Sequence, residues 1–134
     1  MMGRSHKKLE GFHELIVKNT NIQNNNNNLI ITSIDVKNKT ISYCLQTELF
    51  LKYADIYYRE LFESGSLSHN SAVKITFNDI YKIYKTKVAT ECIPYLIMNV
   101  LVKGDIFYSD NGEDYILKNS HNDFVDYLKK IGVI

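Results

Sequence analysis

Residues 103–118 read KGDIFYSDNGEDYILK, and this stretch decides how the C-terminal half of the chain is interpreted. Two short runs that favour β-strand flank Asp110-Asn111-Gly112. Asn-Gly between such runs is the strongest short-range signal for a β-hairpin. Gly104 ends a predicted helix that starts near residue 90, and HNDFVDYLKKIGVI at 121–134 predicts a short C-terminal helix. The hairpin is therefore expected between two helices.

The segment before that helix predicts a helix, a short strand and a second helix. TELFLKYADIYYRELFES at 47–64 carries apolar residues at helical spacing, with Thr47 as a candidate cap and a glycine directly after it. AVKI at 72–75 reads as a short strand. Thr76 then fits the cap of a short helix that breaks near Thr86-Lys87.

The N-terminal third is expected to be an extension of this domain. Residues 5–18 place apolar side chains at helical spacing and predict a helix. The asparagine-rich stretch 19–28 predicts a flexible loop, because asparagine is a poor former of helices and strands. Residues 29–45 form two strand-like runs around Lys37-Asn38-Lys39 and predict a second hairpin.

The order of elements in residues 47–134 resembles the winged helix-turn-helix superfamily. The resemblance is carried by TFNDIYKIYK, ATECIPYLIMNVLVKG and DIFYSDNGEDYIL, with the hairpin as the wing. It implies an α+β fold, with a winged-helix domain at 46–134 and an N-terminal extension at 1–45. Most members place the second helix of the turn in the DNA major groove. A minority join proteins together, and the chain is loosely similar to the winged-helix subunits of ESCRT-II.

The face of the candidate recognition helix opposite the predicted core is mostly apolar. Tyr95, Met98 and Val102 form a stripe there, where a base-reading helix should carry polar side chains. Asn99 is the one plausible base reader on that face, through adenine, and Glu91 near the helix start would repel phosphate. An exposed apolar stripe needs a cover. The cover could be this chain itself, a second copy or another protein.

Basic residues offer a different contact with DNA. Lys82, Lys85 and Lys87 lie on the short helix and in the turn after it, where a winged helix can face phosphate. Lys103 and Lys118 flank the wing, whose tip carries three carboxylates. The lysines and acids of residues 69–134 balance, so any affinity for DNA should be modest and sensitive to salt.

The composition excludes several classes of function. The net charge is +1, and no apolar run approaches the length of a membrane helix. Cys44 and Cys92 read as buried thiols in a reducing compartment, which predicts an intracellular protein of the cytoplasm or nucleus. We find no catalytic motif, no metal-ligand spacing, and no sign of a cofactor or small-molecule substrate. We therefore expect no catalysis and no membrane insertion.

Two functions remain open. The first is a winged-helix protein that self-associates and contacts double-stranded DNA through Lys82, Lys85, Lys87 and the wing. The second is a protein-interaction adaptor or complex subunit that uses the face of Tyr95, Met98 and Val102, with no DNA contact. The resemblance to the winged-helix superfamily favours the first function, whereas the apolar helix face favours the second.

Overall fold

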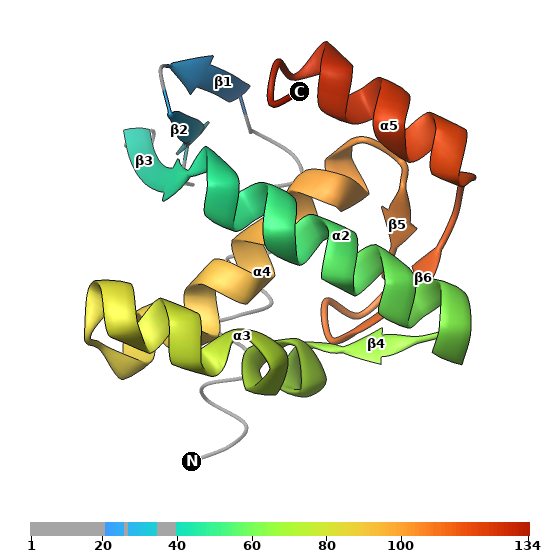
Figure 1. Ribbon diagram of the computed structural model, residues 1–134, viewed down its shortest axis with the longest axis horizontal. Coiled ribbons are helices and arrows are strands. Elements are labelled where there is room, and N and C mark those ends of the chain that lie inside the picture. The colour runs from blue at the N-terminus through green and yellow to red at the C-terminus, as the bar shows by residue number, and fades with distance from the viewer. Residues whose placement is uncertain (1–20, 26, 35–39) are drawn as a thin grey trace.

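The computed structural model describes residues 21–25, 27–34 and 40–134. In these ranges the chain is α+β, with helices packed against two small antiparallel sheets, as predicted (Figure 1). The helix expected at 5–18 and the turn expected at 37–39 lie outside the described residues. The elements run in the order β1 (Asn21–Asn25), β2 (Asn28–Ile34), β3 (Thr40–Gln46), α2 (Thr47–Ser64), β4 (Leu67–Ser68), α3 (His69–Tyr84), α4 (Lys87–Lys103), β5 (Phe107–Tyr108), β6 (Asp114–Leu117) and α5 (His121–Lys130).

The first sheet consists of β1, β2 and β3 in that order. The predicted N-terminal hairpin is confirmed, because β2 pairs with β3 and places Leu29 opposite Leu45. Leu29, Ile31 and Leu45 are all buried. Alternate residues of β2 therefore face the core, because successive side chains of a strand point to opposite faces.

The asparagine-rich stretch forms a strand where a loop was expected. β1 pairs with β2 along its whole length. The side chain of Asn24 donates from Nδ2 to the Gly132 carbonyl at 2.6 Å, and its Oδ1 accepts from the Thr47 hydroxyl at 2.9 Å. The prediction of a flexible loop at 19–28 is therefore wrong for residues 21–25. A neighbouring strand and the distant C-terminus, which lies beside β1 in Figure 1, supply bonds that offset the low strand propensity of asparagine.

Helix α2 has the predicted bounds. Gly65 ends it in the left-handed conformation, with φ of 86°. The cap differs from the expected one, because Gln46 is the N-cap residue and Thr47 is the first helical residue. The buried residues of α2 recur at helical spacing, as predicted, and are Leu49, Phe50, Tyr53, Ala54, Tyr57, Tyr58 and Leu61.

Helix α3 starts earlier than the sequence suggested, and the strand predicted at 72–75 is wrong. The true N-cap is Ser68, whose hydroxyl accepts from the Ser71 amide at 3.1 Å. Thr76 lies inside the helix and donates its hydroxyl to the Ala72 carbonyl at 2.8 Å. The β-branched residues of AVKI are tolerated because packing decides this helix, whose buried stripe contains Ala72, Thr76 and Ile80.

The elements after α3 follow the prediction closely. Thr86 caps α4, and Gly104 is the C-cap residue of that helix. The hairpin is present, since β5 pairs antiparallel with β6 and places Phe107 opposite Leu117. Gly112 has φ of 73° in the connecting loop, a conformation that glycine adopts easily. The second sheet has the order β4-β6-β5.

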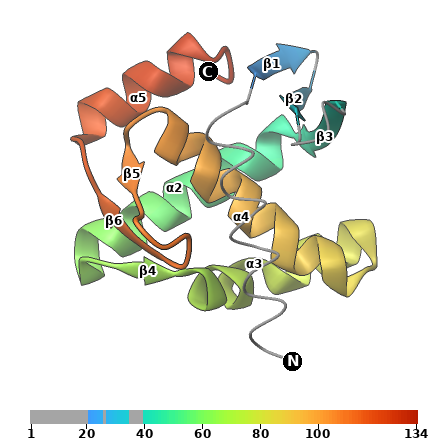
Figure 2. The same cartoon turned by 180° about the vertical axis from the view of Figure 1, so that it is seen from behind.

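The core lies where α2 crosses α4. Figures 1 and 2 show this crossing at the centre, with α3 along one edge of the molecule and α5 along the opposite edge. A capping box of Ser120 and Asp123 starts α5, and Phe124 and Leu128 attach the helix to the core. Buried residues of the first sheet belong to the same apolar cluster as those of α2 and α4.

Candidate functional site

Helix α4, the candidate recognition helix, is buried over most of its length. Every residue from Ile93 to Leu101 is buried, and Val102 is half-buried against the core. Tyr95 is 1% exposed and Met98 is 0% exposed. The prediction of an exposed apolar stripe is therefore wrong for these two residues. The chain itself provides the cover, since α2, α3 and β5 all contact α4.

Asn99 is also buried, which corrects its assignment as a reader of adenine. Its Nδ2 donates to the Tyr95 carbonyl at 2.8 Å and to the Tyr115 hydroxyl at 3.3 Å. Both bonds are buried: the first lies within α4, and the second joins α4 to β6. A base edge cannot reach an amide that is 0% exposed. Asn99 therefore joins the wing to α4 in this structure.

Asn99, Tyr95 and Tyr115 form a buried polar cluster, and His69 extends it to the start of α3. Its Nε2 lies 2.8 Å from the Glu91 carbonyl, so Nε2 carries the proton that it donates. Its ring packs 4.8 Å from the ring of Tyr95, and its backbone amide donates to the Glu113 carbonyl at 2.6 Å. Burial lowers the pKa of His69 and keeps the imidazole neutral at pH 7. The cluster holds α3, α4 and the wing loop together, and the sequence did not suggest it.

Lys82, Lys85 and Lys87 are brought together at the turn between α3 and α4, and all three are exposed. Lys85 is the C-cap of α3 in the left-handed conformation, with φ of 58°. Among the described ion pairs, none includes any of the three. Their charges are therefore available to an anion at this turn.

The two lysines that flank the wing are separate from this turn. Lys103 is exposed at the opposite end of α4, and sixteen residues of helix place it roughly 24 Å from Lys87. Lys118 is engaged with Asp105, with 3.1 Å between Nζ and Oδ1. The predicted DNA-binding set therefore divides into a basic turn, a distant lysine and a paired lysine.

The solvent-facing side of α3 carries two aromatic rings that the sequence reading missed. Phe77 and Tyr81 stack with ring centroids 5.6 Å apart and an interplanar angle of 6°. Phe77 is 38% exposed and Tyr81 is 44% exposed. Both residues lie inside the helix predicted after Thr76, so their spacing of four residues was the signal that could have revealed the pair.

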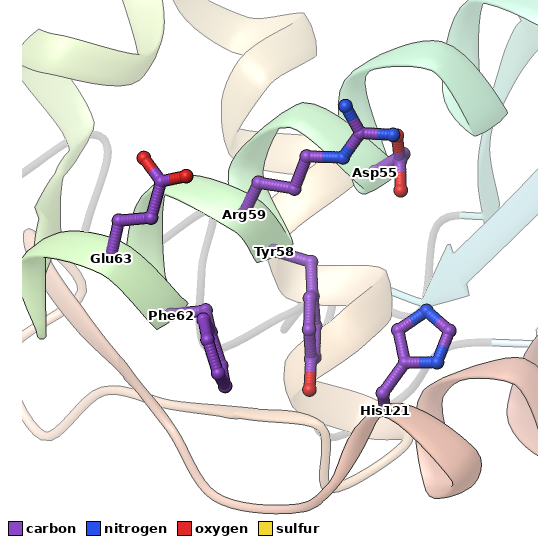
Figure 3. Close-up of a pocket in the computed structure, with 6 residues that line it drawn as sticks. All are labelled: Asp55, Tyr58, Arg59, Phe62, Glu63 and His121. Atoms are coloured by element: carbon purple, nitrogen blue, oxygen red, sulfur yellow. The ribbon is translucent and has the colours of Figure 1, made fainter.

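A pocket of about 300 Å³ lies between α2 and the start of α5 (Figure 3). Tyr58 and Phe62 of α2 project toward α5, which contributes His121. The tyrosine and imidazole rings meet edge to face at 5.5 Å. Arg59 turns away from these rings and pairs with Asp55 at 2.8 Å. The pocket therefore has an aromatic wall and a charged rim.

The described residues offer no metal site and no membrane helix. They contain no cluster of three His, Cys, Asp or Glu side chains arranged to hold a metal ion. None of the helices in the described part is long and apolar enough to cross a membrane. Cys44 is exposed and Cys92 is half-buried, so the expectation of two buried thiols is wrong.

Comparison with known proteins gives no relative for this chain. No family model, no curated protein and no solved structure matches it.

Proposed function

We propose that the protein is a non-catalytic winged-helix protein that binds double-stranded DNA through phosphate contacts of Lys82, Lys85 and Lys87. The topology supports the winged-helix part. The chain runs α2, β4, α3, α4, β5, β6, and its second sheet has the order β4-β6-β5. In a winged helix the strand before the turn pairs with the last strand of the wing, which is the role of β4 beside β6 here.

The basic turn carries the proposal for DNA. Three exposed lysines lie within six residues, where they can approach a phosphate backbone together. Base readout is not part of the proposal, because Asn99 is buried and the rest of the central face of α4 is apolar and covered. Phosphate contacts carry no sequence information by themselves. We therefore expect weak, salt-dependent binding with little preference for sequence.

Fluorescence anisotropy with a labelled mixed-sequence duplex tests the proposal. We expect binding at about 50 mM salt that weakens steeply by about 200 mM. Lys85→Gln with Lys87→Gln should lower affinity and make the slope of log K against log salt shallower by about 1 to 2. Lys129→Gln with Lys130→Gln removes the same charge from the exposed end of α5 and should change little. Equal affinity for all three proteins would exclude the basic turn.

A second candidate function is a protein-interaction adaptor with no DNA contact. The observation that favours it is the aromatic pocket between α2 and α5, where Phe62 is 73% exposed. Exposed aromatic side chains at a pocket are a common feature of protein interfaces. Light scattering on the wild type and on Phe62→Ser separates the cases. A dimer that Phe62→Ser abolishes, together with no duplex binding, would favour this function.

A further inference from the structure

We propose that the solvent-facing side of α3 is a stacking platform for an unpaired strand of nucleic acid. The platform consists of the Phe77–Tyr81 ring pair flanked by Lys74, Lys82 and Lys85. This inference rests on the proposed function and extends it from phosphate contact to a class of ligand. It places the ligand along α3, beside the basic turn.

The ring pair is the first observation. The two rings are nearly parallel and cover one face of each other, so each ring keeps a second face. More than a third of each residue is exposed, in a chain that buries Tyr57, Tyr95 and Tyr115 almost completely. An exposed aromatic face is what a nucleobase stacks on. The ring pair therefore offers a flat apolar surface to solvent on the outer side of a helix.

The charge around the rings is the second observation. At 100° per residue, Lys74 and Tyr81 lie on one line along α3, with Phe77 and Lys82 to either side of it, and Lys85 follows as the C-cap residue of the helix. The single acid in α3, Asp79, is on another side, where Lys52 donates to it at 2.8 Å and Tyr53 also donates. No carboxylate of α3 lies next to the rings or Lys74, although the charge of Lys82 also acts on Asp79. The face with the rings is therefore complementary to a polyanion.

The combination of exposed rings and lysines determines which form of nucleic acid the platform can bind. In a duplex the faces of the bases are covered by their neighbours in the stack, so a duplex can use the lysines but not the rings. In an unpaired strand the bases can turn onto an aromatic ring while the phosphates reach lysines. The platform extends roughly 16 Å from Lys74 to Lys85 along the helix. The platform therefore suits a short single-stranded footprint, whereas a duplex contacts only the lysines.

The test compares two probes on the full chain at about 50 mM salt. One probe is a labelled oligothymidylate longer than the roughly 4–16 nucleotides of a typical single-strand site, and the other is a mixed-sequence duplex. Phe77→Ala with Tyr81→Ala should weaken oligothymidylate binding roughly tenfold or more and leave duplex binding unchanged. Phe77→Tyr with Tyr81→Phe keeps both rings and should retain affinity. Phe62→Ala removes an exposed ring elsewhere and should have no effect.

Each of the other outcomes would contradict the platform, alone or together with the proposed function. Unchanged oligothymidylate binding by the double alanine variant would overturn the platform, while the duplex test on Lys85 and Lys87 would still decide the proposed function. Binding of neither probe by the wild type would overturn both. Light scattering could instead show that the wild type is an oligomer and that only the double alanine variant has a lower mass, with nucleic-acid binding unaltered. That result would identify the face as a contact between copies and overturn the platform. Circular dichroism confirms that each variant is folded.

Discussion

Asn99 is the residue at which a structural role and a base-reading role make opposite predictions. A surface asparagine can be replaced by aspartate at little cost, whereas a buried one cannot. The amide of Asn99 is enclosed between α4 and β6, and its two donor bonds go to Tyr95 and Tyr115. A carboxylate in its place would lose hydration without gaining a cation.

Asn99→Asp should lower the free energy of unfolding by about 3 kcal/mol at pH 7, because it buries an unpaired charge. The loss should shrink as the pH falls toward about 4, because burial raises the pKa of the new carboxyl above its value of about 3.9 in the unfolded chain. Urea unfolding of wild type and variant at several pH values measures the difference. Asn78→Asp, on the exposed side of α3, should stay within about 0.5 kcal/mol. A stable Asn99→Asp protein would contradict the buried role.

Gly104 matters for a reason that differs from the one its position suggested. Its φ is −83°, which any residue adopts, so a helix stop does not require glycine here. A Cβ at this position would instead lie 2.5 Å from the ring of Tyr127. That ring is held in place because its hydroxyl donates to the Val100 carbonyl at 2.9 Å. Burial also raises the pKa of the Tyr127 hydroxyl to about 12.

Gly104→Ala should therefore destabilise the protein by about 1–2 kcal/mol, since the ring of Tyr127 must move. The double variant Gly104→Ala, Tyr127→Leu should lose less than the sum of the two single losses. Chemical denaturation of the four proteins gives this coupling. An alanine variant as stable as the wild type would show that the close approach does not constrain position 104.

At the scale of elements, α3 is where the sequence was misread, and its cap can be tested. Ser68→Ala should lower stability by about 1 kcal/mol, because the Ser71 amide loses its acceptor. Ser66→Ala changes an exposed serine outside the helix and should have a negligible effect. Thermal unfolding of both variants provides the comparison. A larger loss for Ser66→Ala than for Ser68→Ala would place the start of α3 elsewhere.

Helices α2 and α3 are joined by a carboxylate whose ionisation should be visible in the pH dependence of stability. Hydrogen bonds from Lys52 and Tyr53 lower the pKa of Asp79 below its usual value. A carboxyl with a depressed pKa in the folded state stabilises the protein above its unfolded pKa, and this contribution disappears as the pH falls through the folded value. Asp79→Asn should therefore lower the Tm at pH 7 and reduce the fall in Tm below about pH 4. Asp126 is an exposed residue of α5, so Asp126→Asn should give the same dependence of Tm on pH as the wild type.

The elements also show what the sequence could and could not predict. Helices α2 and α4 and the β5–β6 hairpin were predictable, because apolar spacing and Asn-Gly are local signals. The N-terminal part of α3 was not, because AVKI favours a strand locally and only packing in the folded chain makes it helical. The strand β1 depends on partners such as Gly132 that are distant in sequence. The burial of α4 is likewise set by its neighbours, so its apolar face was read as an interface.

At the scale of the whole molecule, the N-terminal sheet is part of the same core as the helices. Leu29 and Ile31 of β2 are 0% exposed and lie in the cluster that contains Phe50 of α2. β3 ends at Gln46 and α2 begins at the next residue, so no linker separates the sheet from α2. Asn24 also bonds to Gly132, near the other end of the chain. These contacts should make the sheet and the helices unfold together.

Leu29→Ala tests this cooperativity. It should lower the free energy of unfolding by about 2–5 kcal/mol, as expected for a leucine removed from a packed core. Far-ultraviolet circular dichroism follows mainly the helices, whereas tyrosine fluorescence follows the packing around the rings. The midpoint of unfolding should shift equally in both signals, because two-state unfolding gives coincident curves. Leu128→Ala, in α5 at the other side of the core, should shift both signals in the same way. A Leu29→Ala protein whose helical transition stays at the wild-type position would mean that the first sheet is a separate unit. In that case residues 46–134 would fold without it, as the resemblance to a single winged helix predicts.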